Sequence, residues 1–253
     1  MSRPAKTRIR QSFERAAPSY DAAAEVQRRI CAQLAGGLPA QAPARWLDAG
    51  CGTGHALGLL GHRYPDSCAI ALDLAGAMLA RIAPPCLRVA GDLEALPLAD
   101  ASLDLYWSSL AVQWCDLPRA LAEAARVLRD GGALRLASLG PATFHELRTA
   151  FAGIDDYRHT LAFHDAAQIA RLAEEAGFSG VRLRSTVEIA HFPDLRALLR
   201  SVKAVGANQL GAGRRTGLMG RSTLARVEAA YEALRTPAGL PLSYDVILLE
   251  ATR

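Results

Sequence analysis

Long apolar runs are missing from this 253-residue sequence, and none approaches the ~18 residues of a membrane-spanning helix. The first residues, MSRPAKTRIRQSFERAA, are basic but lack the apolar centre of a secretory signal. Their arginines and few acids leave a transit peptide as an alternative. We therefore expect a cytoplasmic protein with no membrane association.

Cysteines in pairs are also missing. The five cysteines are an odd number, and no two of them stand in a C-x-x-C spacing. This pattern argues against a disulfide framework or a structural zinc site and is typical of a reducing cytosol. We expect no bound metal. Cys51 lies in a glycine-rich segment, but no partner residue is indicated, so we interpret it as a small packed side chain and not as a nucleophile.

The common phosphate-binding signatures do not occur. There is no G-x-x-x-x-G-K-[ST] motif, so phosphoryl transfer has no support. In WLDAGCGTG the glycines Gly50, Gly52 and Gly54 alternate, and the third comes one residue earlier than in G-x-G-x-x-G. This spacing disfavours the pyrophosphate of a nicotinamide dinucleotide, although that oxidoreductase class stays an alternative.

What is present around these glycines is a strand, a turn and a helix. RWLDA is a short apolar run that predicts a buried strand, and GHALGLLGHRY predicts an amphipathic helix. Glycines between them permit a sharp turn and the close approach of a ligand. Nucleotide-binding α/β folds bind their ligand at such a junction. The alternative is a tight strand-to-helix turn without a ligand.

An acid follows at the distance that a ribose requires. Asp73 ends the predicted strand CAIALD, about twenty residues after the glycines, where a carboxylate can accept hydrogen bonds from two ribose hydroxyls. A helix N-cap would explain the same residue, and the two roles are compatible. The position suits an adenosine-containing ligand, either a nicotinamide cofactor or S-adenosylmethionine. A further acid, Asp92, follows the next predicted strand.

Taken together, four segments resemble the class I S-adenosylmethionine-dependent methyltransferases. They are LDAGCGTG, the acid Asp73, GDLEALPL before LDLYWSS, and ARVLRDGGALRLAS. The resemblance implies that the glycine loop lies under the methionine part of the cofactor, that Asp73 holds the ribose and that Asp92 meets the adenine amino group. The implied cofactor contacts are Asp48, Gly50, Gly52, Gly54, Asp73, Leu74, Met78, Asp92, Leu93 and Ser108.

The fold expected on this basis is α/β, a Rossmann-like seven-stranded methyltransferase sheet in a single domain. Residues 1–40 would form N-terminal helices with a break at APSYD, where Ser19 is a plausible cap, and residues 41–190 the cofactor-binding core. Residues 191–240 would form a helical lid insertion between strands six and seven, and residues 241–253 the last strand. We also expect the helix DLPRALAEAARVLRDGG to close at its two glycines and Ser222 to cap the last helix.

The remaining segments narrow the resemblance. FERAAPSYDAAAEVQRRI, SSLAVQWCDL, KAVGANQLGAGRRTGLMGRS and LPLSYDVIL closely resemble the malonyl-acyl-carrier-protein O-methyltransferases of biotin synthesis. Ser108 departs from that pattern, in which the position is often Asn. The implied reaction is methyl transfer to the free carboxylate of a malonyl thioester, with the acyl carrier protein as partner. A carboxylate is already deprotonated at pH 7, so no general base is needed.

The site would instead need groups that bind a carboxylate. We favour Tyr20 and Arg148 for this role, since the first lies in the N-terminal segment and the second just after the fifth strand. Lys203, Arg214 and Arg215 in the lid insertion are further candidates. Gln113 and Trp114 are expected to line the acceptor pocket, and core packing would also explain Trp114.

Charge is unevenly distributed along the chain. Residues 31–180 carry eleven basic and sixteen acidic side chains, net −5, whereas residues 181–235 carry ten and four, net +6. The basic segment would suit an acidic carrier protein, although a solvated surface explains it equally well. The alternatives are a methyltransferase for a free small carboxylic acid and a non-catalytic assembly factor. Nucleic acid is not expected as a partner, because neither an aromatic-interleaved basic motif nor N-P-P-[YF] occurs.

Overall fold

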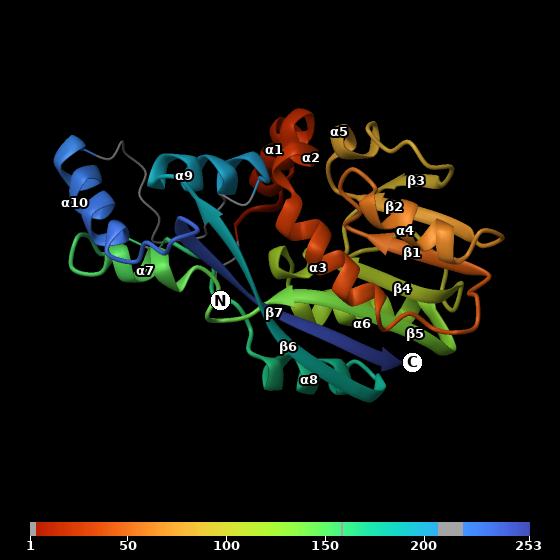
Figure 1. The fold of residues 1–253 in the computed structure, drawn as a ribbon. Helices are drawn as coiled ribbons and strands as arrows, with labels where there is room; N and C mark the ends of the chain where they lie inside the picture. The colour runs from red at the N-terminus through yellow and green to blue at the C-terminus, as the bar shows by residue number, and fades with distance from the viewer. Residues whose placement is uncertain (1–3, 158, 207–219) are drawn as a thin grey trace.

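The computed structural model describes residues 4–157, 159–206 and 220–253. These residues form one seven-stranded sheet in the order β3-β2-β1-β4-β5-β7-β6, with β7 antiparallel to both of its neighbours (Figure 1). The expected α/β sheet is therefore confirmed. The strands are β1 (Arg45–Ala49), β2 (Cys68–Asp73), β3 (Leu87–Ala90), β4 (Leu103–Ser109), β5 (Leu128–Leu139), β6 (Ser179–Phe192) and β7 (Leu240–Thr252).

Helices cover both faces of the sheet, which explains why its central strands are apolar on both sides. On one face, α3 (Glu25–Ala35) and α4 (His55–Arg63) pack on Trp46, Leu105 and Trp107. On the other face, α6 (Leu117–Val127) and α8 (Ala166–Glu175) pack against other apolar residues of the same two strands. These are Leu47, Ala49, Leu103 and Tyr106.

Two of the expected helix ends are wrong. Helix α6 ends at Val127 and not at Gly131–Gly132, because Leu128 already pairs with Leu103 of β4 as the first residue of β5. Helix α10 (Arg221–Glu232) has Gly220 at its N-cap, with no side-chain cap hydrogen bond, so Ser222 lies inside the helix. At the end of α6, strand pairing thus overrides the local turn signal of the two glycines.

The N-terminal segment breaks where the sequence predicts. Helix α1 (Lys6–Ala16) is followed by a 3₁₀ turn, then by α2 (Tyr20–Ala23) and α3. Ser19 stands at the N-cap of α2, but its hydroxyl donates to the Ala16 carbonyl at 3.3 Å and does not cap the helix. Figure 1 shows α1 and α2 at one end of the sheet, beside the short helix α5 (Gly76–Leu79).

The connection between β6 and β7 is helical where the structure describes it. Helix α9 (Leu195–Ala204) contacts α2, and α10 packs against α7 (His145–Phe151) (Figure 1). The first of these contacts brings the lid insertion to the N-terminal helices. Because β1 to β4 are parallel, their carboxyl ends meet at the same edge of the sheet, where α/β proteins bind ligands.

Candidate cofactor and acceptor site

The glycine turn between β1 and α4 has the geometry that the sequence predicts. Gly50, Gly52 and Gly54 have φ values of 77°, 54° and 89°, in the left-handed region that favours glycine. A Cβ atom on Gly50 would stand 2.2 Å from the Cβ of Ala111. The first glycine is therefore required both by its backbone conformation and by the close approach of the loop after β4.

Asp73 holds this turn in place. Its Oδ2 accepts a hydrogen bond from the Gly52 N–H at 2.9 Å, and its Oδ1 accepts one from the Ala75 N–H at 2.8 Å. Burial raises the pKa of this carboxyl, against the effect of the N–H donors, which lower it. The carboxylate thus lies at the junction of two carboxyl-terminal strand ends, and it lines the cleft described next.

A cleft runs along the carboxyl ends of β1 to β4 in two halves that share Tyr20, Gly50, Gly52 and Ser109. One half is lined by the glycine turn and α3 and includes Asp48, Gly54 and Arg28. The other half lies beneath α1 and includes Asp73, Leu74, Asp92 and Leu93. The structure thus brings together eight of the ten residues expected to contact a cofactor.

Asp48 is the most unusual group in the cleft. It is only 2% exposed, and its Oδ2 has no hydrogen-bond partner among the described residues. Burial, with a smaller contribution from the Asp73 charge, raises its pKa to about 8. Burying an unpaired carboxylate is costly, and a cationic ligand would remove that cost. The Asp48 carboxyl group therefore makes this end of the cleft suitable for a positively charged ligand.

Helix α1 closes the other end of the cleft. Lys6 forms ion pairs with Asp92 and with Glu94, the second at 2.7 Å. Glu14 accepts hydrogen bonds from the N–H groups of Gly76 at 2.9 Å and Ala77 at 3.0 Å. The helix is therefore fastened to the start of α5 and to the loop after β3, across the half of the cleft that contains Asp92.

Two expected contacts do not reach the cleft. Ser108 is fully buried, and its hydroxyl donates to the Ala49 carbonyl at 2.8 Å. The next residue, Ser109, lines both halves of the cleft instead. Met78 is also fully buried and packs with Ala16, Ala17 and Ala75 beneath α1. Met78 therefore supports the wall of the cleft from behind.

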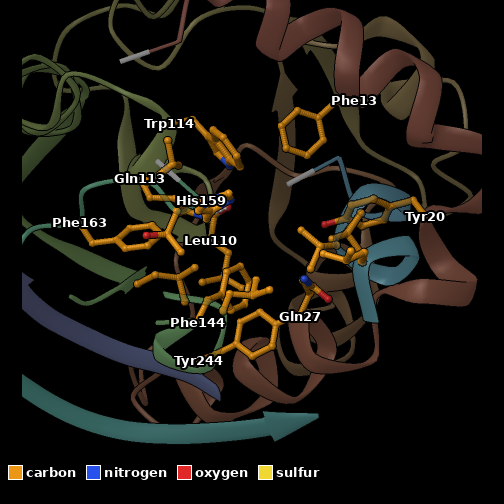
Figure 2. Close-up of a pocket in the computed structure, with 17 residues that line it drawn as sticks. Phe13, Tyr20, Gln27, Leu110, Gln113, Trp114, Phe144, His159, Phe163 and Tyr244 are labelled. Atoms are coloured by element: carbon orange, nitrogen blue, oxygen red, sulfur yellow. Dashed lines mark hydrogen bonds between the residues drawn. The ribbon is translucent and has the colours of Figure 1, made fainter. Parts of the chain in front are cut away.

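A second cavity, the aromatic cavity, abuts this cleft (Figure 2). It shares Tyr20 with both halves of the cleft and Gln27 with the half that contains Asp48. It shares Phe13, Leu110 and Trp114 with the half that contains Asp73. Phe13 and Trp114 meet edge to face with ring centroids 5.7 Å apart. Its other residues are Gln113, Leu139, Phe144, Leu147, His159, Thr160, Leu161, Phe163, Leu199, Val202, Val205 and Tyr244.

Tyr20 is the common wall of all three spaces. Its ring lies about 4 Å from where a Gly52 Cβ would stand. Burial, and to a smaller degree the charge of Asp73, raises the pKa of its hydroxyl. The hydroxyl is therefore a protonated hydrogen-bond donor at neutral pH, at the place where a molecule in the cleft would meet one in the aromatic cavity.

Two of the expected basic residues, Arg148 and Lys203, do not line this cavity. Arg148 donates to the carbonyls of Thr143 at 2.6 Å and Pro141 at 2.9 Å, and it does not line the cavity. Lys203 is exposed, although Leu199 and Val202 of the same helix line the cavity. The predictions for Arg214 and Arg215 lie outside the described residues.

Sequence reasoning missed several lining residues. Phe13 and Gln27 lie in the N-terminal segment that carries the family resemblance but were not singled out there, and no motif marks His159. The Oε1 of Gln27 is buried without a hydrogen-bond partner among the described residues, so this side chain is available to a ligand in either space. Ser109 was within reach of the strand pattern, one residue from the position chosen.

The described residues also bear on metal binding and on membrane association. No group of three or more His, Cys, Asp or Glu side chains is arranged there to hold a metal ion. None of the helices in that part of the chain is long and apolar enough to cross a membrane. Cys51 is buried in the core beside α4, and burial raises the pKa of its thiol.

Comparison with known proteins identifies the class and then the family. Residues 47–136 match the family model described as a methyltransferase domain. An S-adenosylmethionine-dependent methyltransferase from Thermotoga maritima superposes with a TM-score of 0.58 at 18% identity, covering 96% of this chain and 99% of that one. The chain therefore has the fold of an S-adenosylmethionine-dependent methyltransferase.

Curated relatives narrow this class. The chain is 65% identical to the malonyl-[acyl-carrier protein] O-methyltransferase of Dechloromonas aromatica, over 100% of this chain and 96% of the relative. It is 44% identical to the protein of the same name from Laribacter hongkongensis, over 98% and 89%. The chain belongs to the malonyl-[acyl-carrier protein] O-methyltransferase family.

Proposed function

We propose that this protein transfers a methyl group from S-adenosylmethionine to the free carboxylate of a malonyl group carried on acyl carrier protein. The observation that carries the proposal is the arrangement of the two spaces: a cleft with an unpartnered carboxylate abuts an apolar cavity, and Tyr20 forms the wall of both. The family relationship supplies the acceptor.

The cleft residues fit the cofactor. Asp48 would face its cationic methionine portion, Asp73 would accept from the ribose hydroxyls, and Asp92 would meet the adenine amino group. Leu74 and Leu93 would pack against the adenine ring. When bound, the cofactor supplies a methyl group on a positively charged sulfur, which a nucleophile can attack directly.

The protein's own contribution is to bind and orient the acceptor. A carboxylate needs no base at neutral pH, but it must lose water and align with the methyl group. The apolar walls from Leu110, Phe144 and Trp114 exclude water. Tyr20 donates a hydrogen bond from its protonated hydroxyl to one oxygen of the acceptor carboxylate and leaves the other oxygen to attack.

The test is a comparison of acceptors. The protein is incubated with methyl-labelled S-adenosylmethionine and with malonyl-carrier protein, malonyl-coenzyme A or free malonate, and the methyl ester is identified by mass spectrometry. We expect the carrier-bound substrate to have the highest kcat/KM. Preference for free malonate would favour a small-acid methyltransferase instead. Cofactor binding without methylation of any of the three would favour a non-catalytic role.

Tyr20→Phe is the variant that tests the shared wall. Loss of the hydroxyl should lower turnover of malonyl-carrier protein by about 10-fold, the effect of one hydrogen bond to a charged group, with little change in cofactor affinity. An equal loss in both quantities would contradict the role of Tyr20 as a donor to the acceptor.

A further inference from the structure

Among the described residues that line the aromatic cavity, few side chains can pair with the charge of an acceptor carboxylate. Of its described lining residues, His159 alone has a side chain that can become positively charged. Tyr20, Gln27, Gln113, Thr160 and Tyr244 offer only neutral polar groups. An ionised carboxylate that enters such an apolar space requires a charged hydrogen-bond partner.

His159 is held in place from two sides. Its Nε2 lies 2.8 Å from Oδ1 of Asp155, and the two side chains are only 17% and 8% exposed. Its ring stacks on Phe151 of α7, with centroids 3.5 Å apart and an angle of 15° between the planes. Contact with Asp155 leaves Nδ1 as the ring nitrogen for a ligand. A histidine fixed in this way has lost its rotational freedom before the acceptor arrives.

Asp155 also determines which form of the His159 ring, neutral imidazole or imidazolium, can bind an anion. A neutral imidazole has one donor nitrogen and one acceptor nitrogen. If its N–H donates a hydrogen bond to Asp155, the other nitrogen can only accept a hydrogen bond and so cannot bind an anion. An imidazolium donates from both nitrogens, and a carboxylate at each end stabilises its charge. Asp155 would be the carboxylate at one end of the ring, and the acceptor carboxylate would be the one at the other end.

We propose that His159, positioned by Asp155 and Phe151, binds the free carboxylate of the acyl acceptor as an imidazolium ion. This inference rests on the proposed function and names the group that selects the acceptor. His159 takes the place that the sequence assigned to Arg148, whose guanidinium is engaged by two backbone carbonyls.

The pairing also accounts for release of the product. Methyl transfer converts the carboxylate into a neutral ester, so the charge that holds the acceptor at His159 disappears in the reaction itself. The imidazolium then faces a weak acceptor, and the ester loses affinity for the cavity. His159 thus discriminates against acyl thioesters without a terminal carboxylate and against the methylated product.

Binding of two coenzyme A thioesters tests this proposal without turnover. Protein saturated with S-adenosylhomocysteine is titrated with malonyl-coenzyme A and with acetyl-coenzyme A, which lacks the carboxylate. We expect the unmodified protein to prefer the malonyl thioester by about 10- to 100-fold, the range of a charged hydrogen bond. In His159→Phe, which keeps a stacking ring, this ratio should fall close to one while acetyl-coenzyme A binds as before.

Asp155→Asn and a matched control complete the test. Asp155→Asn should lower the ratio by a smaller factor, since it leaves His159 in place but no longer stabilises its charge. His164→Phe is the control: this histidine contacts Gln168, does not line the cavity and should leave the ratio unchanged. Calorimetry with S-adenosylhomocysteine verifies that each variant is folded. If His159→Phe is not folded, the binding ratio of Asp155→Asn tests the proposal in its place.

The outcomes separate the two levels of inference. The proposal is overturned if His159→Phe keeps the preference for malonyl-coenzyme A over acetyl-coenzyme A, or if it binds both thioesters more weakly by the same factor. If His159→Phe does not fold, an unchanged preference in Asp155→Asn overturns the proposal. If the unmodified protein binds the two thioesters equally and methylates neither malonyl substrate, the proposed function itself fails. If it methylates malonyl-carrier protein and only the His159 result is negative, the carboxylate is held by another group.

Discussion

Asp48 is a buried carboxylate with an unpartnered oxygen, and its protonation links the stability of the protein to its ligand. Its pKa of about 8 in the folded protein lies above the value of ~3.9 expected in the unfolded chain. Between these values the folded state binds more protons, so this group makes the free energy of unfolding decrease as the pH rises. A cation bound beside Asp48 would reverse that penalty.

Asp48→Asn should separate these effects. We expect the ligand-free variant to gain thermal stability relative to the unmodified protein as the pH is raised from 5 to 9, because the amide carries no charge. The same variant should bind S-adenosylmethionine about 10-fold more weakly at pH 8, through loss of one charged interaction. Thermal unfolding and calorimetry at three pH values measure both. A stability difference that does not vary with pH would contradict the raised pKa.

At this scale the sequence located the turn and its acids but not every side-chain direction. Gly50, Gly52 and Asp73 were predictable because a motif fixes their spacing. Ser108 and Ser109 were not, since neighbouring residues of a strand point to opposite faces and a shift of one residue exchanges them. The guanidinium of Arg148 donates to carbonyl groups of nearby backbone instead of lining the cavity. No pattern of residue types reveals such backbone contacts.

The turn between β1 and α4 can be tested with a pair of glycines. Gly50→Ala places a methyl group 2.2 Å from Ala111 and forces a side chain into φ 77°. We expect a loss of about 2–4 kcal/mol in unfolding free energy and loss of cofactor binding. Gly58→Ala in α4 is the control, because its new Cβ meets nothing within 4 Å. That variant should be stabilised by about 0.5–1 kcal/mol.

Helix α1 is an element whose attachment should control access to the cleft. Glu14→Ala removes the acceptors of the Gly76 and Ala77 N–H groups. We expect S-adenosylhomocysteine to dissociate about 5- to 10-fold faster, since each charged hydrogen bond that holds the helix contributes modestly. Stopped-flow fluorescence of Trp114, which lines the cleft, measures the rate. Glu175→Ala, on α8 and paired with Arg171, is the matched control and should leave it unchanged.

Element types were predictable and their ends were not. The strands and helices of the core follow from apolar periodicity, and the length of the connection between strands six and seven indicated an insertion with helices of its own. The end of α6 was set too late because the two glycines at 131–132 look like a helix stop, whereas pairing of Leu128 with Leu103 makes the chain extended four residues earlier. Strand pairing depends on residues distant in sequence, so local signals do not contain it.

For the molecule as a whole, the uneven charge should govern encounter with the carrier protein. Arg214→Glu with Arg215→Glu should raise the KM for malonyl-carrier protein more than for malonyl-coenzyme A, because the carrier presents the larger acidic surface. Added salt should have the same unequal effect on the unmodified protein, since the Debye length is about 10 Å at 0.1 M. Steady-state kinetics at two salt concentrations provide the measurement. Carrier kinetics insensitive to both changes would show that the basic segment is ordinary surface.

The walls shared by the cleft and the aromatic cavity predict an order of binding and release. Phe13, Tyr20 and Trp114 contact both spaces, and Phe13 lies on the helix that closes the cleft. We expect an acceptor in the cavity to hold that helix in its closed position, so that the nucleoside enters first and leaves last. In steady state this is a compulsory-order sequence, with S-adenosylhomocysteine competitive against S-adenosylmethionine and noncompetitive against the acyl substrate. Excess acyl substrate would then trap the spent nucleoside and slow its own methylation.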